Sequence, residues 1–299
     1  IGQSVVVMVE QTQIKNETRG RMTSIKETTI QELIDRYPVI LFDSFGVLAS
    51  SNAVLPGAVE LIAGLNRMDK TYFVLTNDAS ALPESRSQKY ANLALTIQPD
   101  QIITSGSLLT RYFADEKLQG LRCVMLGPED SVKYVEYAGG EVVPAGADFD
   151  AVVIGDQAGF PFLETMDQVL TDLFRKIDNG QNVRLILPNP DLIYPDGDGF
   201  GFASASIALM LESALKLRYP ERGDLRFVRL GKPHEAIFAE ALRRSGTRDM
   251  VMIGDQLETD IKGAKDFGLD SVLVGTGIAV HDLSSAPEAV RPTYTMRSL

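Results

Sequence analysis

The chain has little cysteine, a deficit of positive charge and no long apolar runs, and each absence excludes a class of protein. Its single cysteine, Cys123, excludes a disulfide framework within the chain and lies in an apolar run typical of a buried strand. The net charge of −11 argues against a broad contact with nucleic acid or with an anionic membrane. No apolar run approaches the roughly 20 residues that span a bilayer. We therefore expect a soluble, cytoplasmic protein that binds neither nucleic acid nor membrane.

Short apolar runs alternate with amphipathic stretches of helix length along almost the whole chain. The runs are continuous and rich in β-branched residues, as in strands buried on both faces of a parallel sheet. They cover residues 39–42, 72–75, 123–126, 152–154, 183–187, 227–230, 250–253 and 272–274. The stretches that favour helices include 57–69, 162–179, 204–217 and 235–245. This alternation predicts an α/β fold with a doubly wound parallel sheet, in which ligands bind beyond the carboxyl ends of the strands.

At 299 residues the chain is long enough for two domains. Residues 105–226 have strands and helices of their own and interrupt the series of strands that end in polar residues. We interpret them as an α/β domain inserted into a core formed by residues 22–104 and 227–299. Residues 1–21 are interpreted as an extension that precedes a natural start at Met22.

Four of the predicted strands end in polar residues that are followed by turn-forming residues. A single aspartate or a Gly-Lys-Pro loop at a strand end is most often a turn or a helix cap. Four such ends, in order around an insertion, are much less expected by chance, so we expect them to converge on one rim of the sheet. The polar residues concerned are Asp43, Thr76, Asn77, Lys232, Asp255 and Asp260.

The residue types at this rim suit the hydrolysis of a phosphomonoester. Asp43 can attack phosphorus to form an aspartyl-phosphate. Lys232 would neutralise both the nucleophile and a phosphoryl oxygen, and Thr76 and Asn77, with nearby backbone N–H groups, would hold the phosphate.

The same rim offers a set of hard oxygen ligands for Mg²⁺. Asp43, the main-chain carbonyl of Phe45 and Asp255 can bind the ion, and Asp260 can orient a water bound to it. The sequence around Asp156 nearly repeats that around Asp255, but no carboxylate follows Asp156 five residues later. The metal is therefore assigned to Asp255, and Asp156 is placed in the inserted domain.

The four strand ends resemble motifs I to IV of the haloacid dehalogenase superfamily, and the resemblance extends over nearly the whole chain. The insertion resembles the C2 cap of subfamily IIA, a group that includes phosphatases for pyridoxal phosphate, phosphoglycolate, nitrophenyl phosphate and nucleotides. Leu55-Pro-Gly-Ala58 and Asn189-Pro-Asp191 are further features similar to that subfamily.

This resemblance implies an Mg²⁺-dependent phosphatase with Asp43 as its nucleophile. It also implies a cap that closes over a small phosphorylated metabolite, such as a sugar phosphate, and a homodimer formed through that cap. Within the insertion, Asn189, Asp191 and Tyr194 are expected to face the pocket, although turn formation explains Asn189 and Asp191 equally well.

One position departs from the family pattern. The family's phosphatases carry a second aspartate two residues after the nucleophile, where it acts as general acid and base, and here that residue is Phe45. The main-chain carbonyl remains available to Mg²⁺, but a proton donor typically worth ~10²–10⁴-fold in rate is missing. A phosphatase with a slow or substituted acid step is the first interpretation, a phosphate-binding protein with weak or no turnover is the second, and carbon–halogen hydrolysis is the third. His234 could replace the acid, but its place at a helix start beside Lys232 favours a structural role.

Overall fold

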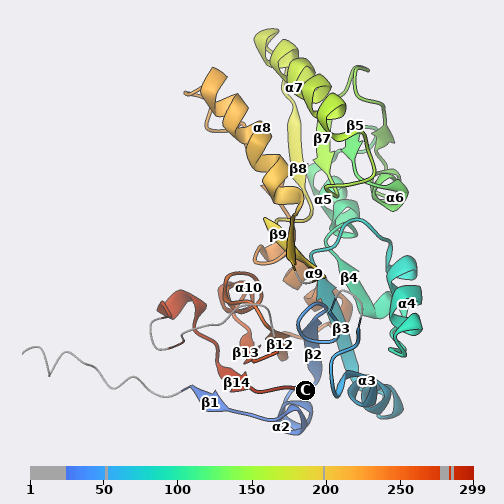
Figure 1. Cartoon of the computed structure of the whole chain (residues 1–299), viewed down its shortest axis with the longest axis vertical. Helices are drawn as coiled ribbons and strands as arrows, with labels where there is room; N and C mark the ends of the chain where they lie inside the picture. The colour runs from blue at the N-terminus through green and yellow to red at the C-terminus, as the bar shows by residue number, and fades with distance from the viewer. Residues whose placement is uncertain (1–24, 51–52, 198, 277–282, 284–285) are drawn as a thin grey trace, which may run out of the picture.

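The computed structural model describes residues 25–50, 53–197, 199–276, 283 and 286–299. The extension predicted over residues 1–21 lies outside this part of the chain. Strands and helices alternate in it and build two parallel sheets, which lie one above the other in Figure 1. None of the helices in these ranges combines the length and the apolar character needed to cross a membrane.

The first sheet has, within the described residues, seven parallel strands in the order β1-β14-β13-β12-β2-β3-β4. The strand β2 is buried along its whole length, as the continuous apolar run predicts for a strand covered on both faces. Because β2 lies between β12 and β3, the carboxyl ends of these three strands are neighbours. The strands are β1 (Lys26–Glu27), β2 (Val39–Asp43), β3 (Thr71–Thr76), β4 (Ile102–Thr104), β12 (Met250–Gly254), β13 (Asp270–Val274) and β14 (Tyr294–Met296).

Helices cover both faces of this sheet, and successive side chains of β2 point to opposite faces. Ile40 packs in one apolar cluster with Ile62 of α3, whereas Leu41 packs in another with Phe238 of α9. The helical segments around the first sheet are α2 (Ile30–Arg36), α3 (Ala58–Arg67), α4 (Pro83–Asn92), η1 (Pro99–Gln101), α9 (Glu235–Ser245), the π-helical turn η2 (Leu257–Ile261), α10 (Lys262–Asp266) and η3 (Glu288–Val290).

The second sheet is built from five described parallel strands in the order β11-β8-β7-β5-β6. Cys123 is buried in β5, and burial raises the pKa of its thiol to about 12, which fits the predicted inert strand residue. The strands are β5 (Arg122–Leu126), β6 (Glu141–Val142), β7 (Ala151–Ile154), β8 (Arg184–Leu187) and β11 (Val228–Arg229). The accompanying helices are α5 (Leu108–Glu116), α6 (Glu129–Tyr137), α7 (Phe162–Asp178) and α8 (Ser204–Arg218).

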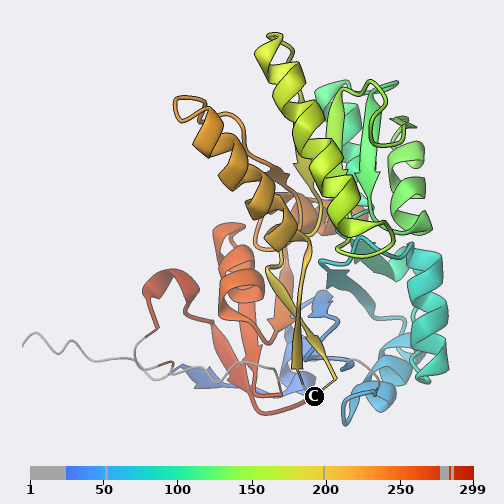
Figure 2. The same cartoon turned by 45° about the horizontal axis from the view of Figure 1, so that its top comes forward.

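An antiparallel hairpin, β9 (Ile193–Asp196) and β10 (Gly199–Phe202), follows β8. It descends from the second sheet toward the first (Figure 2). We call the seven-stranded sheet with its helices the core, and the five-stranded sheet with its helices and this hairpin the cap. The predicted α/β class, with a doubly wound parallel sheet and an inserted α/β domain, is confirmed.

One strand lies in a different sheet from the one expected. The run 227–230 was assigned to the core, but β11 pairs with β8 of the cap, with Val228 opposite Ile186. A strand this short has no local feature that specifies its partner, because pairing depends on residues about 40 positions away. The consequence is that Lys232 lies where the chain returns from the cap to the core.

Candidate active site

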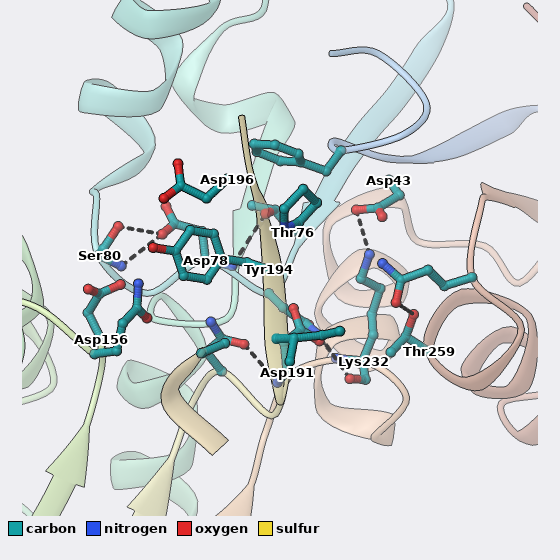
Figure 3. A pocket seen from close by; sticks show the side chains of 18 of the residues that line it. Asp43, Thr76, Asp78, Ser80, Asp156, Asp191, Tyr194, Asp196, Lys232 and Thr259 are labelled. Atoms are coloured by element: carbon teal, nitrogen blue, oxygen red, sulfur yellow. Dashed lines mark hydrogen bonds and ion pairs between the residues drawn. The ribbon is translucent and has the colours of Figure 1, made fainter. Parts of the chain in front are cut away.

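Three strand ends meet at the carboxyl edge of the core sheet. Asp43 is the last residue of β2, Thr76 is the last residue of β3, and Asp255 directly follows β12. A cavity of about 370 Å³ lies over this edge, between core and cap. Asp43, Thr76 and Lys232 line it from the core, and Figure 3 shows their side chains together.

Three buried carboxylates lie beside a single lysine at this edge. Asp43, Asp255 and Asp260 each offer an oxygen within 4.8 Å of the others, and none of the three residues is more than 6% exposed. The Nζ atom of Lys232 lies 2.6 Å from Oδ1 of Asp43 and 2.7 Å from Oδ1 of Asp260. The ammonium group of Lys232 therefore pairs with two of these three carboxylates.

Burial and attraction to the oppositely charged partner act in opposite directions on the pKa values of Asp43 and Lys232. Burial raises the pKa of Asp43 well above its usual range, and repulsion from Asp260 adds to this effect while Lys232 opposes it. Burial alone would lower the pKa of Lys232, but attraction by Asp260 and Asp43 reverses that effect and raises it. The lysine is thus held as a cation between two carboxylates.

The loop after β2 approaches Asp255 so closely that only glycine fits. Gly46 has a φ of +75°, and a Cβ atom there would lie 2.3 Å from Oδ2 of Asp255. The hydroxyl of Thr276 donates a hydrogen bond of 2.7 Å to the carbonyl of Gly46 and holds the loop in place. The loop that carries Phe45 is therefore pressed against the carboxylates. This close cradle of hard oxygens fits a divalent cation.

Gly46→Ala is expected to damage the carboxylate site as well as stability. A positive φ costs an alanine about 1–2 kcal/mol, and the added methyl group must also displace Asp255. We expect metal affinity to fall roughly 10–100-fold, as for other groups that orient metal ligands. The matched control is Gly180→Ala, because Gly180 has a φ of +72° but nothing within 4 Å of its Cβ position. Metal-binding calorimetry and denaturant unfolding on both variants test this, and equal metal affinities would contradict it.

Asn77 connects the cap with Lys232. Its Nδ2 donates to Oδ1 of Asp191 at 2.7 Å and to the carbonyl of Lys232 at 3.0 Å. Its Oδ1 accepts from the backbone N–H of Lys232 at 2.7 Å. A Cβ atom on Gly231 would lie 2.5 Å from that Oδ1, which explains a glycine before the lysine. Asn77 was predicted to bind substrate, but these bonds occupy its amide, so we infer that it positions Lys232 and Asp191.

The cap residues singled out in the sequence also reach the cavity. Asn189, Asp191 and Tyr194 all line it. Oδ1 of Asn189 accepts from the N–H of Asp191 at 3.0 Å. Asn189 therefore stabilises the turn, which is the alternative role that the sequence left open for it. Phe45 is half-buried and lines the cavity, whereas His234 is the N-cap residue of α9 and is not among the described residues that line it.

Two polar features of the cavity were not predicted. Arg86 of α4 pairs through Nε with Oδ2 of Asp78 at 2.6 Å. Burial raises the pKa of Asp78, but Arg86 and Ser80 outweigh burial and hold the pKa below its usual value. Asp156, set aside in the sequence as a decoy for Asp255, lines the cavity from the cap, and burial raises its pKa. Asp78 directly follows Thr76 and Asn77, so its place at the same polar strand end could have predicted that it lines the cavity. No feature of the sequence indicates that Arg86 approaches the cavity.

The fold and the site together define a capped α/β hydrolase with a carboxylate centre. A haloacid dehalogenase-like hydrolase family model matches residues 40–141, and a HAD-hydrolase-like model matches residues 229–299. Dihydroxyacetone phosphatase of Corynebacterium glutamicum is 28% identical over 261 residues, which is 87% of this chain and 88% of that protein. Acid sugar phosphatase of Staphylococcus saprophyticus is 26% identical over 267 residues, with 88% and 95% covered.

A solved structure is also similar over almost the entire chain. It is a possible sugar phosphatase of the HAD superfamily from Cytophaga hutchinsonii, with a TM-score of 0.77 and 31% identity over 92% of this chain and 98% of that one. The chain belongs to the haloacid dehalogenase superfamily, as its motifs predicted, and it is a hydrolase of the phosphatase type with the cap arrangement of subfamily IIA.

Proposed function

We propose that this protein hydrolyses a small, hydroxylated phosphomonoester through an aspartyl-phosphate on Asp43, with Mg²⁺ as its cofactor. The observation that carries the proposal is the position of Lys232 Nζ, 2.6 Å from Asp43 and 2.7 Å from Asp260 at the floor of the cavity. A buried nucleophile beside a fixed cation is the arrangement that phosphoryl transfer requires. A metal-supplemented screen of phosphomonoesters, with Asp43→Asn as the control, tests it.

Each residue of the core site has a separate role in the proposed reaction. Asp43 attacks phosphorus, and Lys232 lies where it can neutralise a phosphoryl oxygen at the same time. Thr76 lies at the end of the neighbouring strand and lines the cavity, where its hydroxyl can hold a second phosphoryl oxygen. Asp260 accepts from Lys232 and from the backbone N–H of Gln256 at 3.2 Å, and this fixes the lysine in place.

Mg²⁺ would be held by Asp43, Asp255 and the main-chain carbonyl of Phe45, with Asp260 in support. The support for this proposal is the group of three carboxylates and the close approach of Gly46 to Asp255. When bound, the ion would neutralise charge on the carboxylates and on the phosphoryl group.

The charge of the cavity supports a hydroxylated substrate. The two cations that line it are already paired, Lys232 with Asp43 and Arg86 with Asp78. Among the described residues, no salt bridge includes the cap-side carboxylates, which belong to Asp156, Asp191 and Asp196. Carboxylates accept hydrogen bonds from sugar hydroxyls and repel a second anionic group.

Glycerol phosphate is therefore expected to be a better substrate than phosphoglycolate, with kcat/KM higher by about tenfold or more. The two molecules are of similar size, but phosphoglycolate would place a carboxylate against the cap side of the cavity. The double variant Asp156→Asn, Asp196→Asn should reduce this preference, because it removes two of the repelling charges. Equal kcat/KM values for the two substrates, or a preference that the double variant leaves unchanged, would count against the assignment.

We also propose the homodimer through the cap that the family resemblance implies. Its support is a set of exposed apolar side chains on α8, namely Leu209, Met210 and Leu217. Analytical ultracentrifugation measures the association.

A further inference from the structure

The site lacks a proton donor at the position where the family's phosphatases carry one. Phe45 occupies that position and lines the cavity, and its ring cannot transfer a proton. An alkoxide is a poor leaving group, so hydrolysis of a sugar phosphate needs an acid near the leaving oxygen. Besides Asp43, the carboxyl groups that line the cavity are those of Asp78, Asp156, Asp191 and Asp196.

Their surroundings distinguish these four groups. Asp78 is paired with Arg86 at 2.6 Å and is held ionised, so it has no proton to give. Asp156 follows β7 and Asp196 ends β9, both within the cap, and among the described residues neither side chain has a hydrogen bond or an ion pair with the core. Asp191 alone among the four is bonded to Asn77, the residue that holds the backbone of Lys232. It is thus the cap carboxyl tied to the phosphate-binding part of the core.

The backbone and one oxygen of Asp191 are fixed, which leaves the other oxygen for the cavity. Its N–H donates to Asn189 at 3.0 Å, its carbonyl accepts from the N–H of Ala205 at 3.0 Å, and Oδ1 accepts from Asn77. In the described part of the chain no protein group donates to Oδ2. In Figure 3, Asp191 lies between Lys232 on one side and Asp156 on the other.

Burial brings the pKa of Asp191 closer to neutrality than that of an ordinary carboxyl. Burial raises its pKa to about 6, with a contribution from Asp260, while the bond from Asn77 and the charge of Lys232 act against this rise. The other charged groups that line the same cavity are Asp43, Asp78, Arg86, Asp156 and Asp196. A carboxyl in this range can give a proton and take one back at the pH of the cell.

We propose that Asp191 is the general acid and base of the reaction, in place of the aspartate that is absent at Phe45. The inference rests on the proposed function. As Asp43 forms its bond to phosphorus, the bond between phosphorus and the leaving oxygen breaks, and its electron pair stays on that oxygen. The Asp191 carboxyl gives that oxygen its proton, which releases the alcohol and leaves a carboxylate. This carboxylate then takes a proton from water while the water oxygen attacks phosphorus. The bond between phosphorus and the Asp43 oxygen breaks, and its electron pair returns to the Asp43 carboxylate. Inorganic phosphate is freed, and both aspartates are restored.

The test compares two leaving groups in Asp191→Asn. Asparagine keeps the size of the side chain and an oxygen that can accept from Asn77, so the turn and the lysine should stay in place. We expect kcat/KM for glycerol phosphate to fall ~10²-fold or more, and that for nitrophenyl phosphate to change by less than about tenfold, because nitrophenolate leaves without a proton. Asp35→Asn, the same change on the exposed face of α2 and outside the cavity, is the matched control, and it should leave both values unchanged.

Two further measurements separate catalysis from structure. Adding Phe45→Asp to Asp191→Asn should restore much of the glycerol phosphate rate. Wild-type kcat/KM for glycerol phosphate should decrease relative to that of Asp191→Asn as the pH rises through about 6, because Asp191 then loses its proton. The substrate phosphate titrates in the same range in both proteins, so its effect cancels in this comparison.

Equal losses on both substrates in Asp191→Asn would show a structural role and overturn the proposal. No loss on either substrate would also overturn it. If the proposed function itself is wrong, the experiments give a different result. In that case Asp43→Asn would still release phosphate from nitrophenyl phosphate, or the wild-type protein would hydrolyse neither substrate.

Discussion

Asp43→Asn is expected to lower the turnover of every phosphomonoester by about 10⁴-fold or more. The amide has the size of the carboxylate but cannot attack phosphorus, so the aspartyl-phosphate cannot form. It also removes one partner of Lys232, although Asp260 still holds that lysine at 2.7 Å. Release of inorganic phosphate from nitrophenyl phosphate and from glycerol phosphate, followed with time, measures the effect.

The matched control is Asp35→Asn, the same change on the exposed face of α2. It should leave turnover at the wild-type level, and thermal unfolding of both variants shows whether they are folded. Phosphate release by Asp43→Asn at the wild-type rate would mean that another group is the nucleophile. A wild-type protein that binds phosphate tightly but turns over no phosphomonoester would favour the phosphate-binding interpretation instead.

Removal of divalent metal by a chelator is expected to reduce turnover about 10³-fold or more, and Mg²⁺ should restore it. The reason is the charge of the site, where three buried carboxylates lie together and Lys232 pairs with Asp43 and Asp260. The attacking carboxylate and the phosphate repel each other unless further positive charge is present.

Binding of the ion also has a readout that does not depend on activity. At a concentration 100 times its dissociation constant, a ligand of the folded state stabilises the protein by about 2.7 kcal/mol, which raises the melting temperature. Asp255→Asn should lose most of this increase, whereas KCl at the same ionic strength should not produce it in either protein. Full turnover in chelated protein, or an equal increase for Asp255→Asn, would contradict the metal site.

The parts of the fold that sequence could predict are those with strong local patterns. β2 and β12 are continuous apolar runs, and α7 and α9 have clear helical periodicity, so all four were expected within one or two residues of their bounds. β4 and β14 have only three residues each, which is too short to show any periodicity. The partner of β11 depends on long-range pairing and not on its own residues, and so its sheet was assigned wrongly.

The residues of the candidate site also include some that local sequence patterns predict and some that they do not. Asp43 and Asp255 follow strand runs within a few residues, so the topology rule for parallel sheets brings them together. Arg86 lies on the polar helix α4 and looks like a solvated residue in the sequence, although in the structure it is largely covered and paired with Asp78. The link from Asn77 to Asp191 joins residues 114 positions apart in two domains, and no local pattern could have shown it.

The central claim, covalent catalysis by Asp43, is tested most directly by trapping the intermediate. Wild-type protein with Mg²⁺ and nitrophenyl phosphate is quenched in acid within one turnover, and the peptide that contains Asp43 is analysed by mass spectrometry. The account predicts a peptide heavier by one phosphoryl group, with the added mass on Asp43, and no such peptide from Asp43→Asn. Rapid phosphate release with no labelled peptide at any quench time, or with the label on another residue, would contradict it.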